Sequence, residues 1–467
     1  DDEPEELCFA IRKSRTDTAF AMDFVSKEDE ELFRTTTPMT RMIKVSPFEY
    51  ADKSQMKDYV LKEIESRYPA ETETAEGDMS WQEFMELGRN FEGEYLAPTD
   101  PERAVFGAYT SGSTGISKLV IHSSANVVAT AFQMSIFIPP SEVQEVWWTP
   151  ILPPALIAVT VSMTIFPLST GLLVELDPFC PLEDIDIEFM DRKPNFWALI
   201  PKYCDLLMNS KRIPEDYDMS HLRTIGAGAE AMNDRKYAEV EEFFHKHNIK
   251  AKLSAGYGQS EGCSNFTLPN PMFPLEDGCV GMPMPATVLG VFDKDLNELN
   301  YGEAGELCMT GPSMMIHYSG WRGEEMTEKT LIEHPDGNTW LHTGDEAYIT
   351  EQGIIHILGR GAIRAYGDKP LRVMRMETKA VRTPGVQDGF FCVVPDMEHE
   401  GYFRPYLFVI LDGTRTLEEV AELLKDTLDE HEYPVEIRVI TERPYFHFKT
   451  NRKELTAQIL EELQQVE

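Results

Sequence analysis

The chain has 467 residues, of which 42% are hydrophobic and 10% aromatic, and its formal net charge at pH 7 is -37. This composition is that of a globular protein, and the length exceeds what one hydrophobic core usually supports, so we expect two or more domains. Nucleic acids and anionic membrane surfaces are bound through clustered Lys and Arg, so the excess of Asp and Glu argues against both as partners.

The seven cysteines are scattered along the chain, and none are spaced as C-x-x-C. This pattern argues against a disulfide framework and against a zinc site, and it favours a reducing, cytoplasmic compartment. No charged segment followed by an apolar one stands at the start, and the first residue is Asp1 rather than Met. The sequence therefore shows no secretory leader, and whether residues precede Asp1 stays open.

The first hundred residues are polar and acidic, and helical patterns stand out only near 57–68 and 81–91. From Ala104 onward, short apolar runs alternate with helical patterns, which predicts parallel strands joined by crossover helices. Ligands of such folds bind at the carboxyl ends of the strands. The expected strands are VFGAY (105–109), WALIP (197–201), LRTIGAG (222–228) and KLSAGYG (252–258), and the expected helices follow His122, start near Tyr203 and cover 234–247.

The first of these strands runs into YTSGSTGISK, residues 109–118, which is rich in glycine and hydroxyl side chains and ends in one lysine. Such a segment is either a plain surface loop or a phosphate-binding loop, in which glycines let backbone amides approach an anion. It is not the Walker loop, since no Gly-Lys-Ser/Thr closes it. The candidate phosphate ligands are Thr110, Ser111, Gly112, Ser113, Thr114, Gly115 and Lys118.

Residues 146–174 contain no charged side chain and are long enough to cross a bilayer. Several prolines interrupt the segment, and its flanks are Glu145 and Glu175 rather than basic anchors. We therefore predict a buried helix near 154–165 followed by a buried strand near 171–175, and no membrane span.

After Gly278 the sequence changes to short β-rich pieces separated by Gly and Pro turns. Residues 359–361, Gly-Arg-Gly, look like a junction, and the tail beyond them contains two expected strands, 390–396 and 406–411. Thr416 and Glu419 have the spacing of a capping box, which predicts the start of a helix. The tail therefore reads as a compact α+β domain.

Taken together and in order, these motifs resemble those of the adenylate-forming superfamily, which contains acyl- and aryl-CoA synthetases, the adenylation domains of peptide synthetases, and luciferases. The resemblance covers roughly residues 105–455. The motifs that carry it are YTSGSTGISK (109–118), GAGAE (226–230), GYGQSE (256–261), VGMPMP (280–285), GELCMTGPSMMIHYSG (305–320), HTGDEAYITEQG (342–353) and LGR (358–360).

The expected fold class is α/β. A large N-terminal domain, residues 1–360, would contain Rossmann-like parallel sheets sandwiched with helices plus a β-rich subdomain, with residues 1–100 atypical. A small, mobile α+β C-terminal domain, residues 361–467, would carry the catalytic lysine. Most members of the superfamily have a longer Rossmann-like half before the phosphate loop than the hundred residues found here.

The resemblance implies ATP-dependent activation of a carboxylic acid to an acyl-AMP with release of pyrophosphate, followed by transfer to a thiol, for which coenzyme A is the expected acceptor. ATP and Mg²⁺ are the implied cofactors. The alternatives are an enzyme that loads a separate carrier protein, and a non-catalytic nucleotide-binding relative. No aspartate that could hold a substrate amine lies within 146–174, and Leu156 stands where many relatives have a histidine or an aromatic residue. An amine-free acid with an apolar body is therefore expected.

The resemblance also implies a role for each candidate residue. Lys118 and the loop would hold the β- and γ-phosphates, and Glu261 would bind magnesium together with Thr114. Asp345 and Arg360 would bind the ribose hydroxyls, and Lys449, within FKTNRKEL (448–455), would be the catalytic lysine, with Lys453 as the alternative. The residues expected around the adenine are Gly228, Ala229, Glu230, Tyr257, Gly258 and Ser260.

Two motifs depart from the superfamily pattern. The aspartate usually found two residues after the Arg360 position is replaced by Ala362, and the glycine before Lys449 is replaced by Phe448. The first departure falls where the small domain would rotate between the two half-reactions, and the second lies beside the catalytic lysine. Both keep the non-catalytic alternative open.

Overall fold

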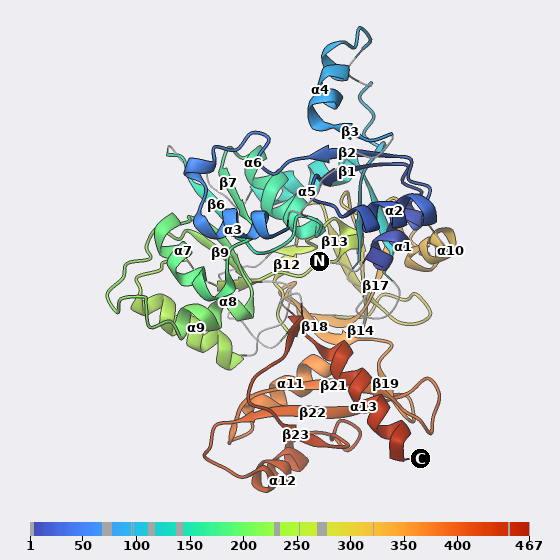
Figure 1. Ribbon diagram of the computed structural model, residues 1–467. Helices are drawn as coiled ribbons and strands as arrows, with labels where there is room; N and C mark the ends of the chain where they lie inside the picture. The colour runs from blue at the N-terminus through green and yellow to red at the C-terminus, as the bar shows by residue number, and fades with distance from the viewer. Residues whose placement is uncertain are drawn as a thin grey trace.

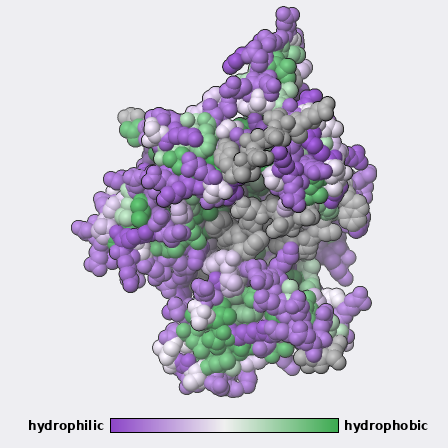
Figure 2. All heavy atoms as spheres, in the orientation of Figure 1, coloured by the Kyte–Doolittle hydropathy of each residue, from purple (hydrophilic) through white to green (hydrophobic). Residues whose placement is uncertain are grey.

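The computed structural model describes residues 4–67, 77–94, 96, 98–110, 117–136, 143–227, 234–251, 253–268, 278–320, 322–446 and 449–466. In Figure 1 the elements from α11 onward gather beneath the rest of the molecule, and helix α4 projects from the opposite end. Figure 2 shows hydrophilic side chains over much of the same face, as expected from the net charge of -37.

The described part of the N-terminal region contains four α-helices and a small parallel sheet in the order β1-β2-β3. Its core consists of Cys8, Phe33, Met39 and Met42. The two helices predicted from the sequence are confirmed as α3 and α4, whereas the sheet was not predicted, because its strands have only five, five and two residues. The elements are α1 (Pro4–Ser14), β1 (Thr18–Met22), α2 (Lys27–Thr36), β2 (Arg41–Val45), α3 (Asp58–Arg67), β3 (Met79–Ser80) and α4 (Trp81–Arg89).

A five-stranded parallel sheet in the order β10-β9-β8-β6-β7 forms the centre of the large N-terminal part. This arrangement confirms the strands predicted near 171–175, 197–201, 222–228 and 252–258 and the crossover helices, whereas the strand at 146–150 was not predicted. The strands are β6 (Val146–Pro150), β7 (Leu173–Asp177), β8 (Phe196–Leu199), β9 (Thr224–Ala227) and β10 (Leu253–Ala255). The helices that follow them are η2 (Ala158–Ile165), α6 (Phe166–Ser169), α7 (Ile185–Arg192), α8 (Pro201–Met208) and α9 (Asp234–Lys246).

Helices cover both faces of this sheet, because neighbouring residues on a strand point to opposite sides. Trp147 and Phe196 lie on one face, with ring centroids 5.9 Å apart, and pack with residues of α5 (Ser124–Ser135) and α6. Trp148 and Trp197 lie on the other, 5.2 Å apart, and pack with α7, α8 and α9. The sheet is therefore the middle layer of a three-layer α/β sandwich.

The uncharged segment 146–174 is built into this sandwich. It contains β6, the π-helix η2, helix α6 and the start of β7. The predicted helix begins at Ala158 rather than Pro154, because Pro153 and Pro154 are followed by a turn in which Leu156 N donates to Pro153 O. Among the helices that the structure describes, none combines the length and apolarity that a bilayer span requires.

Strand β4 (Ala104–Tyr109) exists as predicted, but the expectation that it belongs to the parallel sheet is wrong. It pairs antiparallel with β5 (Leu119–Ser123), which pairs in turn with β15 (His317–Ser319). The connection from β4 to β5 is a hairpin rather than a crossover helix, which dictates antiparallel pairing. The candidate phosphate-binding loop connects these two strands in the sequence.

The β-rich region is an antiparallel sheet in the order β13-β14-β17-β16, and β18 also pairs with the long strand β17. Its core includes Leu307, Met309, Leu341 and Ile355. The predicted strands of this region are therefore confirmed. The elements are β11 (Thr267–Leu268), β12 (Met282–Pro283), β13 (Val288–Phe292), β14 (Gly305–Thr310), α10 (Gly323–Thr330), β16 (Leu331–Glu333), β17 (Thr339–Ile349) and β18 (Ile355–Arg360).

The C-terminal elements surround a three-stranded sheet in the order β21-β22-β23. Phe391 faces α11 and α12, and Phe390 faces α13. The predicted capping box of Thr416 and Glu419 is confirmed at the start of α12. The elements are β19 (Arg364–Ala365), β20 (Lys369–Pro370), α11 (Val373–Arg382), β21 (Val386–Pro395), β22 (Phe403–Leu411), α12 (Leu417–Thr427), β23 (Ile437–Val439), β24 (Tyr445–Phe446), β25 (Lys449–Thr450) and α13 (Arg452–Val466).

Candidate active site

The two ends of the candidate phosphate-binding loop are held together by hydrogen bonds. Thr110 N donates to Lys118 O at 2.9 Å, and Lys118 N donates to Thr110 Oγ1 at 3.0 Å. Ser117 Oγ donates to Thr110 O at 2.6 Å. These bonds fix the base of the loop and the direction in which Lys118 leaves it. Ser111, Gly112, Ser113, Thr114 and Gly115 lie outside the described residues.

Lys118, Glu261 and Tyr318 form a polar cluster beside this base. Lys118 Nζ donates to Tyr318 Oη at 3.1 Å and lies 3.8 Å from Glu261 Oε1. Tyr318 Oη donates to Glu261 Oε1 at 2.5 Å, and burial together with the Glu261 carboxylate raises the pKa of Tyr318. The cluster therefore places a cation and a buried carboxylate next to each other, beside the loop predicted to bind phosphates.

The position of Glu261 is fixed by backbone contacts on both sides. His122 Nε2 lies 2.7 Å from Ser260 O, and Met315 N donates to Glu261 O at 2.8 Å. Gly258 permits the tight turn that follows β10, because a Cβ atom at this position would collide with the carbonyl oxygen of Ser264. The GYGQSE motif is thus a rigid turn at the carboxyl end of a parallel strand.

Asp345 and Arg360 are direct cross-strand partners on β17 and β18. Arg360 Nε lies 3.1 Å from Asp345 Oδ1, while Tyr257 Oη and Gln259 Nε2 donate to Asp345 Oδ2 at 2.5 and 2.9 Å. Burial raises the pKa of Asp345, although the neighbouring Arg360 opposes this effect. A buried carboxylate that is already oriented in this way can accept a further hydrogen bond from a ligand hydroxyl.

Tyr257 connects the two motifs. Its hydroxyl group is engaged with Asp345, and its ring packs edge-on against Phe266 with centroids 5.5 Å apart. Burial and the Asp345 carboxylate raise the pKa of Tyr257 well above its usual value. Its expected stacking on an adenine stays a prediction, and Gly228, Ala229 and Glu230 lie outside the described residues.

Lys449 lies on the two-stranded hairpin β24-β25, in register with Phe446. Lys202 Nζ lies 5.2 Å from the centroid of the neighbouring Tyr445 ring. Because Lys202 belongs to the first turn of α8, directly after β8, the hairpin lies at the carboxyl end of the parallel sheet. The hairpin is therefore close to the expected ligand site, and the catalytic role of Lys449 stays a prediction.

Two residues that build these clusters were not singled out from the sequence. Gln259 and Tyr318 lie inside the GYGQSE and GELCMTGPSMMIHYSG motifs. The only available signal was that position, because nothing in the sequence shows that Gln259 reaches the Asp345 carboxylate or that Tyr318 bridges Lys118 and Glu261. Both contacts join segments that are far apart in the chain.

Comparison with curated proteins finds relatives among CoA ligases. The chain is 26% identical over 325 residues to a long-chain-fatty-acid–CoA ligase of Escherichia coli O157:H7, a match that spans 65% of this chain and 52% of that protein. It is 28% identical over 218 residues to a 4-coumarate–CoA ligase of Pinus taeda, across 45% of this chain and 38% of that protein. The matches thus span about half or less of the length of these relatives.

Solved structures match over nearly the whole chain. ATP-bound MatB from Rhodopseudomonas palustris has a TM-score of 0.72 at 18% identity, over 98% of this chain and 92% of that one. O-succinylbenzoate coenzyme A synthetase (MenE) from Bacillus subtilis, in complex with ATP and a magnesium ion, has a TM-score of 0.65 at 19% identity, over 97% and 91%. At these identities the likeness shows the α/β fold alone.

The family model described as AMP-binding enzyme matches residues 2–319. This range includes the first hundred residues, in which no motif was recognised, as well as the phosphate-loop, GAGAE and GYGQSE motifs. It covers more than half of the chain, and the chain therefore belongs to the family of AMP-binding enzymes.

Proposed function

We propose that the protein is an ATP-dependent acid–thiol ligase, which converts a carboxylic acid to an acyl-AMP with release of pyrophosphate and then transfers the acyl group to coenzyme A. The observation that carries this proposal is the cluster of Lys118, Glu261 and Tyr318 beside the base of the glycine-rich loop. The CoA ligases among the relatives support the choice of reaction.

The cluster has the chemistry that the first half-reaction requires. Two anions, a carboxylate and the α-phosphate, must approach each other, so preorganised positive charge and hydrogen-bond donors stabilise the transition state. Lys118 would supply positive charge at the phosphates. When bound, Mg²⁺ would neutralise phosphate charge, and Glu261 is the residue that would hold it, because a buried carboxylate offers the hard oxygen ligand that Mg²⁺ prefers.

The second cluster would hold the nucleoside. The Asp345 carboxylate, oriented by Tyr257, Gln259 and Arg360, would accept a hydrogen bond from the ribose. Neither cluster alone specifies the reaction, since oriented carboxylates also occur in other nucleotide-binding proteins. Together they would bind both ends of ATP, at the carboxyl ends of the parallel strands, where ligands of open α/β folds bind.

The remaining charge would come from the C-terminal elements. The β24-β25 hairpin lies at the carboxyl end of β8 and would bring Lys449 to the acyl and phosphate oxygens during adenylation. We propose an amine-free acid with an apolar body as substrate, because the segment 146–174 offers no carboxylate to hold an amino group.

The test is pyrophosphate release from Mg-ATP with a panel of fatty, aryl and amino acids, with and without coenzyme A. The expected result is acid-dependent release, thioester formation on addition of coenzyme A, and a steep loss of release in Lys449→Ala but not in the matched variant Lys453→Ala. Release without thioester would exclude coenzyme A as acceptor and point to a carrier protein. ATP binding without release for every acid would overturn the proposal in favour of a non-catalytic relative.

A further inference from the structure

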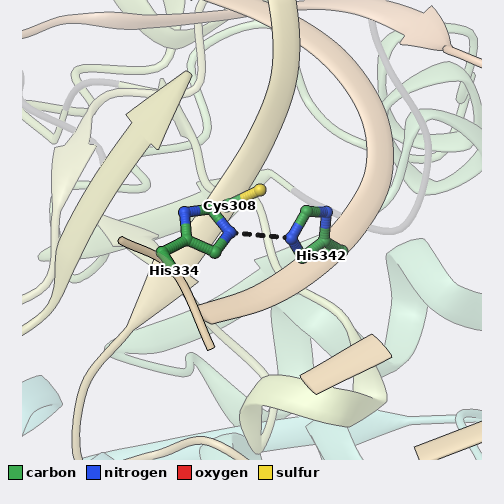
Figure 3. Close-up of side chains that lie close together, drawn as sticks. All are labelled: Cys308, His334 and His342. Atoms are coloured by element: carbon green, nitrogen blue, oxygen red, sulfur yellow. Dashed lines mark hydrogen bonds between the residues drawn. The ribbon is translucent and has the colours of Figure 1, made fainter. Parts of the chain in front are cut away.

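A second cluster of chemically reactive side chains lies in the β-rich region and has no role in the proposed reaction. Cys308, His334 and His342 each offer one ligand atom, and these atoms all lie within 4.8 Å of one another. Figure 3 shows the two imidazole rings facing each other edge to edge, with the Cys308 sulfur beside them. Cys308 and His334 are buried and His342 is nearly so.

The register of the antiparallel sheet brings the three residues together. Cys308 on β14 and His342 on β17 are direct cross-strand partners. His334 directly follows β16, and the turn between β16 and β17 is closed by the hydrogen bond from His334 N to Asn338 O at 2.9 Å. All three positions are therefore fixed by regular backbone pairing, as a preorganised site requires.

His342 uses one ring nitrogen to bind a carboxylate, as metal-binding histidines usually do, and this leaves the other nitrogen to face the cluster. His342 Nδ1 lies 3.0 Å from Glu306 Oε2, so the proton on this nitrogen is donated to a carboxylate and the lone pair remains on Nε2. That Nε2 atom is 2.9 Å from His334 Nε2. Glu306 also accepts a hydrogen bond from Gly344 N at 3.0 Å, which fixes its carboxylate.

The environment of His334 leaves one of its nitrogens unsatisfied. Its Nδ1 is buried and has no hydrogen-bond partner among the described residues. Phe292 packs perpendicular to its ring at 4.5 Å, and Trp340 lies at 5.6 Å, so the walls of the cluster are apolar. The other polar atoms of the cluster have partners, since Cys308 Sγ lies 3.9 Å from Glu306 O and His342 uses both of its ring nitrogens. The buried His334 Nδ1 is therefore the atom that a purely structural hydrogen-bond network would be expected to satisfy and does not.

We propose that Cys308, His334 and His342 bind a single transition-metal ion, with Zn²⁺ as the best match to one sulfur and two imidazole ligands. The absence of C-x-x-C spacing argued against zinc in the sequence, but these ligands meet across strands rather than along one loop. In a tetrahedral site with Zn–N bonds of about 2.0 Å, two ligating nitrogens lie about 3.3 Å apart. The observed 2.9 Å is close enough for a small ring movement to admit the ion.

Binding would proceed with loss of the thiol proton, because the thiolate is the form of cysteine that ligates metals. Three protein ligands leave a fourth position for water. Since His342 and Gly344 are both tied to Glu306, the ion would also fix the strand segment that leads to Asp345.

The test is metal titration of the full chain after removal of metals with a chelator. Calorimetry with Zn²⁺ at moderate salt is expected to give one site per chain. Co²⁺ in place of Zn²⁺ is expected to give a thiolate-to-metal charge-transfer band. This measurement on the unmodified protein needs no variant and is independent of catalytic activity.

Variants assign the ligands. Cys308→Ser is expected to abolish the charge-transfer band, and His334→Gln and His342→Gln to weaken Zn²⁺ binding by more than Glu306→Gln, for which a loss of about 10- to 100-fold is expected. Cys392→Ser, which removes a buried cysteine in the small C-terminal domain, is the matched control and should leave binding unchanged. Absence of the Co²⁺ band from the unmodified protein, or Zn²⁺ binding that survives all three ligand substitutions, would overturn the proposal and leave a structural histidine pair that shares one proton.

Discussion

Replacement of Asp345 by asparagine separates ligand binding from stability. The carboxylate can accept about four hydrogen bonds, two on each oxygen. Tyr257 and Gln259 occupy the two positions on Oδ2, and Arg360 occupies one of the two on Oδ1. Counting only the contacts of the described residues, one position on Oδ1 remains for a ribose hydroxyl. Asp345→Asn keeps the shape of the side chain but removes its charge.

The expected loss in ATP affinity follows from this count. One hydrogen bond to a charged acceptor contributes about 1.5–3 kcal/mol, so the dissociation constant should rise about 10- to 100-fold. Folding should respond differently, because burial raises the pKa of Asp345 and makes its ionised form unfavourable in the folded state. With a folded pKa above the unfolded value, the wild type loses stability relative to Asp345→Asn as pH rises through that interval.

Two measurements check this reasoning: ATP binding by calorimetry, and the free energy of unfolding in urea at several pH values. Asp396→Asn is the matched control, because Asp396 is also a buried carboxylate and is paired with Arg404 at 3.0 Å, but lies in the C-terminal part. The control should lose stability and keep its ATP affinity. An unchanged ATP affinity in a folded Asp345→Asn protein would refute the assigned role.

Three further substitutions test the structure. Gly258→Ala should lower the free energy of unfolding by about 1–3 kcal/mol in urea titrations, because a Cβ atom collides with backbone at this turn. Tyr318→Phe should lower it by a similar amount in thermal unfolding, since Glu261 remains buried and loses its 2.5 Å donor. Burial alone would raise the pKa of Asp388, but hydrogen bonds from Arg443 outweigh it and lower the pKa. The stabilisation from this ion pair is present above about pH 4 and is lost as the pH falls through the folded pKa. In Arg443→Gln the free energy of unfolding should therefore fall less between about pH 4 and lower pH than it does in the wild type. If Arg443→Gln loses as much stability at acid pH as the wild type, the role of the Asp388–Arg443 pair is contradicted. If Gly258→Ala or Tyr318→Phe is as stable as the wild type, the contact that it tests is contradicted.

The sequence predicted where helices and strands lie better than it predicted which strands pair with each other. The parallel strands β8 and β9 were recognised because their apolar runs and the helices after them are local patterns, whereas β6 was not predicted. The pairing of β4 was predicted wrongly, because VFGAY reads alike in a parallel or an antiparallel sheet. The direction is decided by the return of the chain to β5, which pairs antiparallel with β4.

For the candidate site, the sequence predicted ionisable residues but not their contacts. Glu261 and Asp345 were identified from their motifs, whereas the hydrogen bonds of Tyr318 and Gln259 to them were not. Such contacts depend on how the turn after β10 packs against strands of two other sheets, β15 for Tyr318 and β17 for Asp345. For the same reason the cluster around Cys308 could not be predicted, since its members meet only when β14 and β17 are in register.

The π-helix η2 has an evolutionary consequence. It accommodates more residues per turn than an α-helix, so deletion of one residue between Ala158 and Ile165 would tighten the segment instead of breaking it. In a regular α-helix the loss of one residue rotates the preceding side chains by about 100° relative to those that follow. In η2 the wide turn would absorb most of that rotation, so Leu156, just before η2, would stay close to its present orientation relative to α6. A lineage carrying this helix can thus accept a change in length that would displace the same side chain in a regular α-helix.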